Sequence, residues 1–132
     1  MGLERIRKIL GARVQNLEAQ NFEKTKYGKK LSFLKDCHKG EKCFVIGNGP
    51  SLEVKDLDKI YESGLVSFAT NRVFKIFEKT KWRPTYYVSE DILLMQDAQK
   101  IIEEMDVEGR FIPINLKWYK GVDIPNADYF YI

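Results

Sequence analysis

The chain of 132 residues is poor in cysteine and lacks long apolar runs. Its two cysteines, Cys37 and Cys43, stand either side of the single histidine, His38, without the spacing of a metal site. This number of thiols argues against a disulfide-stapled secreted scaffold and favours a reduced, cytoplasmic protein. No segment approaches the roughly 18 apolar residues that a membrane span needs, so we expect no transmembrane helix.

Charge is modest in total and uneven along the chain. The net charge is +3, but residues 1–42 carry eleven Lys and Arg against five Asp and Glu, and the remainder is slightly acidic. This basic arm is either a solvated helix and linker or a surface attracted to an anionic membrane or another polyanion. The second reading adds the inner face of the membrane to the predicted cytoplasmic location. Nucleic acid is not expected, because the basic residues are not interleaved with aromatics on one face.

The order of the elements predicts an N-terminal arm over residues 1–40 and a nucleotide-binding domain over 41–132. An amphipathic helix is expected first, because Leu3, Ile6, Leu10, Val14 and Leu17 recur at steps of three or four. The stretch "QNFEKTKYGKK" then reads as a polar connector. Five short apolar runs follow, at 43–46, 65–70, 86–89, 111–114 and 129–132, with starts about 18 to 25 residues apart. That spacing fits βαβ units, so we predict an α/β fold with an open, mostly parallel Rossmann-like sheet and helices on both faces.

The pieces between these runs have the marks of crossover helices. "KDLDKIYESG" offers Asp56 as an N-cap and Gly64 just beyond the end. Residues 71–80 should bury an apolar face, and the next helix is expected to bury five apolar residues on one side: Leu93, Leu94, Ala98, Ile101 and Ile102. Trp82 is expected to pack, with stacking on a ligand as the alternative.

Polar clusters follow the first four predicted strands. They are Gly47-Asn48-Gly49-Pro50-Ser51, Thr70-Asn71-Arg72, Ser89-Glu90-Asp91 and Asn115-Leu116-Lys117-Trp118. The carboxyl ends of parallel strands share one edge of a sheet, where open α/β folds bind their ligands. We therefore expect a single binding crevice.

The glycine loop could bring backbone amides close to an anion, although it is neither a Walker A loop nor a full dinucleotide fingerprint. The alternative is a simple turn after a strand. Asn71 could contact a base or sugar, and Arg72 a phosphate, while Asn71 would equally serve as a helix N-cap. Glu90 and Asp91 could bind ribose hydroxyls, hold a metal or transfer protons, and Asp91 could instead cap the next helix.

Three segments together, "GEKCFVIGNGPSL", "FATNRVFKIF" and "WRPTYYVSED", resemble a bacterial and archaeal family with a Rossmann-like domain. This family includes surface-polysaccharide proteins and a group related to archaeal 6-hydroxymethylpterin diphosphokinase. Bacterial sialyltransferases that use CMP-sialic acid share the "GNGPSL" loop and an Asn after the second strand. The resemblance covers roughly residues 40 to 95.

The resemblance implies that residues 47–51 wrap the nucleotide's phosphate and sugar and that Asn71 touches the nucleotide. The sequence departs from the sialyltransferases at 89–91, where they carry another Asn. Such proteins also continue further, so we expect this chain to be the nucleotide-binding half, incomplete at its C-terminus. No catalytic base can be named, because the sialyltransferases' catalytic His lies in that later half.

The leading hypothesis is a glycosyltransferase-like protein of bacterial surface-polysaccharide synthesis that binds a nucleotide-activated sugar, with no metal or separate cofactor. One alternative is a phosphotransferase that uses ATP with Mg²⁺ held by Glu90 and Asp91. The other is a non-catalytic binding or assembly module, which could form homo-oligomers through an unpaired edge strand.

Overall fold

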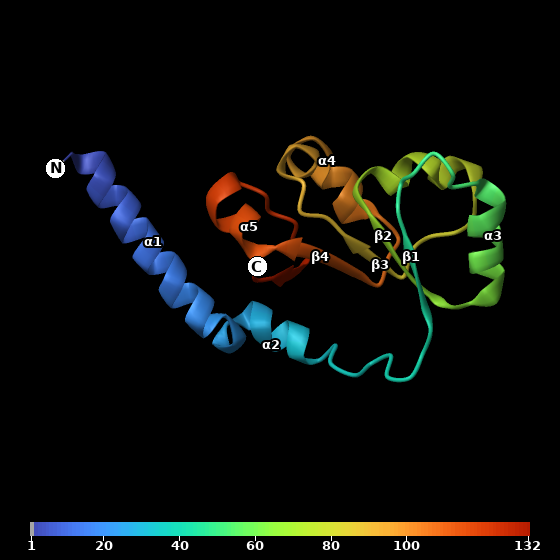
Figure 1. Ribbon diagram of the computed structural model, residues 1–132, viewed down its shortest axis with the longest axis horizontal. Coiled ribbons are helices and arrows are strands. Elements are labelled where there is room, and N and C mark those ends of the chain that lie inside the picture. The colour runs from blue at the N-terminus through green and yellow to red at the C-terminus, as the bar shows by residue number, and fades with distance from the viewer. Residues whose placement is uncertain (1) are drawn as a thin grey trace.

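The computed structural model describes residues 2–132, without the side chains of residues 3, 7, 8, 15, 18 and 19. Two helices and a short 3₁₀ turn come first, and strands then alternate with helices to the C-terminus (Figure 1). The helical elements are α1 (Leu3–Asn21), η1 (Phe22–Lys24), α2 (Lys26–Ser32), α3 (Val54–Ser63), η2 (Asn71–Lys79), α4 (Ile92–Glu104) and α5 (Ile114–Lys120). The strands are β1 (Cys43–Ile46), β2 (Val66–Thr70), β3 (Tyr86–Val88), β4 (Gly109–Pro113) and β5 (Asp128–Phe130).

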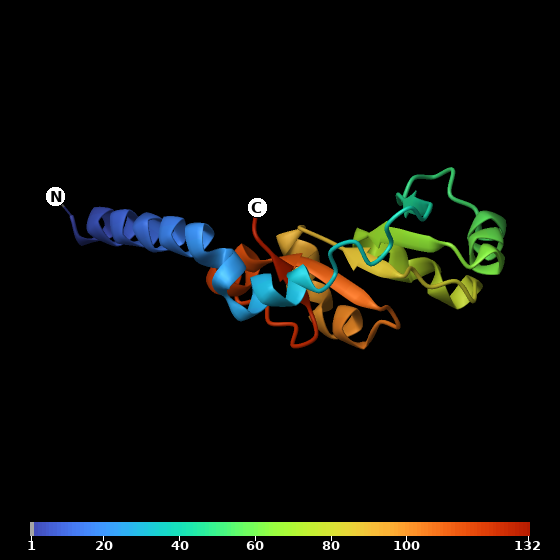
Figure 2. The ribbon, with the colours of Figure 1, turned by 90° about the horizontal axis from the view of Figure 1, so that it is seen from below.

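The five strands form one all-parallel sheet, which confirms the predicted α/β fold with an open Rossmann-like sheet. The strands follow their sequence order, β1-β2-β3-β4-β5, and each pairs in parallel with the next. Right-handed crossovers between consecutive strands lie on one face of a sheet. Figure 2 shows η2 and α4 on the same side of the sheet accordingly.

Side-chain burial differs between the two faces of the sheet. The face toward the crossovers carries fully buried positions on successive strands, among them Ala69, Tyr87 and Ile112. The alternate positions Phe68 and Val88 point to the other face and are only half-buried. That second face is partly covered by residues 33–42, from which His38 Nε2 lies 2.7 Å from the Tyr86 hydroxyl. The core therefore lies between the sheet and its crossovers.

The predicted polar connector contains a helix, so that prediction was wrong. Thr25 begins α2, because its hydroxyl accepts a hydrogen bond from the Gly28 amide at 3.2 Å. A Cβ at Gly28 would lie only 2.3 Å from the Phe22 carbonyl, so glycine allows α2 to fold back closely on η1. Lys30 then pairs with the buried carboxylate of Asp128 at 2.7 Å, which holds α2 against β5.

Helix α1 projects away from the sheet (Figures 1 and 2). The predicted stripe is helical, and Ile6, Leu10, Val14 and Leu17 are all exposed to solvent. The side chain of Leu3, the fifth member of the stripe, lies outside the described residues. None of the helices in the described part has both the length and the apolar character that crossing a membrane requires.

Two details of the predicted helices differ from the structure. Asp56 is not the N-cap of α3, because the helix begins at Val54 and Asp56 lies in its first turn; Gly64 does end α3, in the left-handed conformation with φ of 65°. In α4 the buried side chains include Leu94, Met95, Ala98 and Ile102. Leu93 and Ile101, which we expected on that face, are 69% and 49% exposed.

Candidate functional site

Asn71 stands at the junction of β2 and η2 in an uncommon backbone conformation. Its φ is 50°, in the left-handed region that asparagine tolerates better than most residues. Two buried side chains from β3 and its end hold it there. The Tyr87 hydroxyl donates to the Asn71 carbonyl oxygen at 2.8 Å, and the Ser89 hydroxyl donates to Asn71 Oδ1 at 3.1 Å. Asn71 is thus positioned by the core rather than by the surface.

These contacts leave the other end of the Asn71 amide available. Ser89 occupies Oδ1, and no described residue accepts a hydrogen bond from the side-chain nitrogen. Asn71 is exposed. An amide nitrogen held in place with free donors suits a sugar hydroxyl, a base carbonyl or a phosphate oxygen. Asn71 is not the cap that we considered for η2, because Thr70 occupies that position.

The glycine loop after β1 lies beside this junction. Asn48 Nδ2 donates to the Thr70 carbonyl oxygen at 2.7 Å, which ties the loop to the end of β2. Gly47 and Gly49 do not have left-handed φ values. A Cβ would meet nothing within 4 Å at Gly47, and at Gly49 only the Ser51 hydroxyl at 3.8 Å. The chain's own packing therefore does not require glycine at either position.

A groove lies between this loop and η2, at the carboxyl edge of the sheet. Its volume is about 480 Å³. The residues that line it are Asn48, Gly49, Leu52, Arg72, Val73, Lys75, Ile76 and Lys79. Three of these are basic, and among these lining residues none is acidic. The groove is therefore a site of positive potential with apolar patches from Leu52, Val73 and Ile76.

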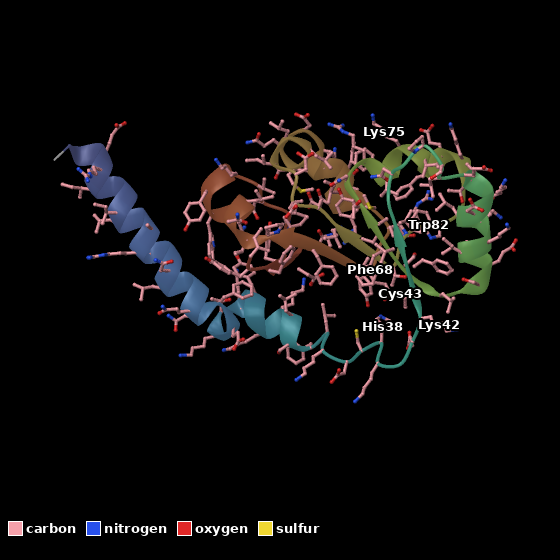
Figure 3. The ribbon with its side chains drawn as sticks, in the orientation of Figure 1. His38, Lys42, Cys43, Phe68, Lys75 and Trp82 are labelled. Atoms are coloured by element: carbon pink, nitrogen blue, oxygen red, sulfur yellow. The ribbon has the colours of Figure 1, made fainter. Side chains whose placement is uncertain are left out.

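Lys75 and Lys79 were missed in the sequence analysis. They follow Arg72 in η2, a 3₁₀ helix, and all three cations line the groove. Figure 3 places Lys75 at the opposite end of the strands from His38, Lys42 and Cys43. The three cations are evident in "NRVFKIFEK", but the apolar residues between them were interpreted only as a buried helix face.

The third predicted cluster divides by role. Ser89 is 3% exposed and supports Asn71 from beneath. Asp91 caps α4, because its Oδ1 accepts a hydrogen bond from the Leu94 amide at 3.0 Å. Glu90 is exposed, and neither Glu90 nor Asp91 lines the groove. In the described part of the chain, no three His, Cys, Asp or Glu side chains are grouped as metal ligands.

The remaining predicted residues lie beside the groove. Pro50 and Ser51 form the exposed turn that the Leu52 amide closes onto the Gly49 carbonyl oxygen at 3.1 Å. The structure therefore brings Asn48, Gly49 and Arg72 together in the groove, with Gly47 and Asn71 adjoining it in the chain. Ser89, Glu90 and Asp91 stand behind or beside that set.

Tyr87, which holds the Asn71 backbone, should make the protein less stable at alkaline pH. Burial raises its pKa from 10.0 to about 12. Because the folded pKa exceeds the unfolded one, this contribution is complete below pH 10 and is lost as pH rises toward 12. Tyr87 by itself should lower the free energy of unfolding by roughly 2–3 kcal/mol across that interval. Urea denaturation from pH 8 to 12 measures it.

Two phenylalanine variants separate Tyr87 from the other tyrosines. Tyr87→Phe should lower stability at pH 8 by about 1 kcal/mol, from the lost hydrogen bond, and reduce the alkaline decline. Part of the decline should stay, because burial also raises the pKa of Tyr86 to about 12. Tyr61→Phe, at an exposed position on α3, should keep the wild-type decline. Equal declines in all three proteins would contradict the assignment to Tyr87.

No family model, curated protein or solved structure matches the chain. Fold and geometry therefore define the class: an open parallel α/β protein with a basic groove at the carboxyl edge of β1 and β2.

Proposed function

We propose that the groove binds the phosphate of a nucleotide-activated sugar and that the chain is the nucleotide-binding half of a sialyltransferase-like glycosyltransferase. One observation carries the proposal. The loop after β1 has glycines where the packing of the protein leaves room for a side chain, and it faces the three cations Arg72, Lys75 and Lys79. Loop amides and clustered cations are the groups that bind phosphates in α/β folds. The place of the groove, at the carboxyl ends of parallel strands, supports the same class of ligand.

The proposed chemistry is transfer of the sugar. An acceptor hydroxyl attacks the anomeric carbon, the bond from that carbon to the nucleotide's phosphate oxygen breaks, and the nucleotide leaves. Negative charge then grows on the departing phosphate. Arg72 and the two lysines of η2 would stabilise it, and the Asn71 amide would bind the nucleotide. The base that removes the acceptor's proton is not assigned.

An NMR titration of the chain with CMP, UDP, GDP and ATP, with and without Mg²⁺, tests this proposal. We expect Mg²⁺-independent shifts centred on Gly47, Gly49, Asn71 and Lys75. Affinity should fall as salt rises, because the three cations are exposed. Shifts for ATP alone, and only with Mg²⁺, would favour the phosphotransferase. If the folded chain showed no shifts with any of the four nucleotides, this would contradict nucleotide binding and favour the assembly module.

Gly49→Ala gives the matched variant for that titration. The added Cβ has room within the protein, so stability should stay within about 0.5 kcal/mol of the wild type or rise. Where a ligand approaches the backbone, the same methyl group should lower affinity about tenfold. Gly11→Ala, whose Cβ would meet nothing within 4 Å, should leave affinity unchanged. Unaltered affinity in Gly49→Ala would mean that the ligand does not approach this loop.

A further inference from the structure

Helix α1 presents apolar side chains that the rest of the chain does not cover. Ile6, Leu10, Val14 and Leu17 are 41–59% exposed, and in the described part of the chain α1 packs mainly against η1. At 3.6 residues per turn these four side chains fall within roughly 80° of the helix circumference. In proteins most of the stability of a helix comes from packing of its apolar face, so we expect a surface to cover the stripe.

The charge around the stripe indicates what that surface is. Leu3–Asn21 holds four basic residues against two acidic ones. The excess of positive charge continues beyond the helix, where Lys24, Lys26 and Lys29 are exposed. An anionic surface would attract this whole arm, whereas a second copy of the arm would repel it.

Arg13 also favours an anionic surface over a second copy of α1 as the partner of the stripe. It stands seven residues after Ile6, at a position that a two-helix seam would need to be apolar, and it is exposed. Pairing of two α1 helices would bury this charge beside the partner's stripe. At a lipid surface the aliphatic part of Arg13 covers the edge of the stripe while its guanidinium reaches the phosphate layer.

We propose that α1 lies on an anionic membrane surface, with the stripe of Ile6, Leu10, Val14 and Leu17 in the acyl boundary and the basic residues at the headgroups. The helix rests on the bilayer and does not cross it, in keeping with its several charges. This inference rests on residues outside the groove and is independent of the nucleotide.

Co-sedimentation with vesicles tests the proposal on the full chain. The probes are phosphatidylcholine vesicles with and without about one third phosphatidylserine, at low and high salt. We expect binding to the anionic vesicles only, weakened at high salt. Circular dichroism should show more helix when the vesicles are present.

Two variants with the same change in charge locate the contact. Leu10→Asp should weaken binding about a hundredfold, because it adds a negative charge and removes apolar burial. Ala12→Asp, on the opposite side of α1, should weaken it only about fivefold, through charge alone. Equal losses in the two variants, or equal binding to neutral vesicles, would overturn the proposal. So would a dimer in sedimentation velocity that Leu10→Asp dissociates, because the stripe would then pair with a second copy.

Discussion

Replacement of Asn71 by Asp is expected to lower nucleotide affinity at least a hundredfold while the domain stays folded. The aspartate keeps an oxygen that can accept from the Ser89 hydroxyl, and it tolerates the left-handed backbone at φ of 50°. It loses the two amide donors and puts a negative charge where the phosphate or sugar binds. Repulsion of like charges a few ångströms apart near a protein surface is on the order of 3 kcal/mol, or a hundredfold. Isothermal titration calorimetry and thermal denaturation measure the two effects.

Asn71→Gly serves as the control for backbone conformation. Glycine adopts positive φ without strain, so this variant removes the side chain and adds no charge. Its affinity should fall about tenfold, between those of the wild type and Asn71→Asp. Alanine is a poorer choice, because it tolerates the left-handed region less well than asparagine and would mix stability with binding. If Asn71→Asp bound nucleotide as tightly as the wild type, Asn71 could not be near the ligand.

The fold class was predictable because the apolar runs are short and evenly spaced. Each of the five predicted runs overlaps a strand to within two residues at its start, and Gly64 ends α3 as its position indicated. The strand order was not predictable. Pairing of β1 with β2 and of β4 with β5 depends on how the crossovers pack, and periodicity contains no information on that.

Local propensity also misled in places. Residues 26–32 look polar and include Gly28, yet they form α2, because Tyr27 packs edge-on against Tyr129 and Lys30 pairs with Asp128. These partners are about one hundred residues away in sequence. In α4, the backbone departs from helical geometry at Ala98, where φ is −123°. Leu93, which the helical period placed on the buried face, is exposed. Tertiary contacts overrode the local pattern in α2. In α4, the wrong prediction of the buried face goes together with a departure from helical geometry.

For the candidate site, the strand-end rule indicated the edge of the sheet at which the groove lies, but not the division of roles. It placed Asn48, Gly49, Asn71 and Arg72 near one groove, which the structure shows as neighbours. It could not show that the Ser89 hydroxyl points inward to Asn71 or that Asp91 caps α4. Both depend on side-chain direction at the end of β3. Whether the groove binds a nucleotide stays a prediction.

Trp82 is expected to be the largest single contributor to stability among the residues considered as ligand contacts. It is 1% exposed, its indole nitrogen donates to the buried Ser67 hydroxyl at 3.2 Å, and its ring packs edge-on against Phe77. Figure 3 shows Trp82 within the folded domain, near the strands. Trp82→Ala should lower the free energy of unfolding by about 3–5 kcal/mol, from the cavity and the unpaired hydroxyl. Urea denaturation measures this loss.

Trp82→Phe separates packing from stacking on a ligand, the two roles that the sequence left open. The smaller ring keeps most of the core contact but loses the hydrogen bond to Ser67, so the expected cost is roughly 1–2 kcal/mol. Nucleotide affinity, measured under conditions where the variant is fully folded, should equal that of the wild type, because Trp82 does not line the groove. A variant with wild-type stability and weakened nucleotide binding would reverse the assignment and move Trp82 from the core to the site.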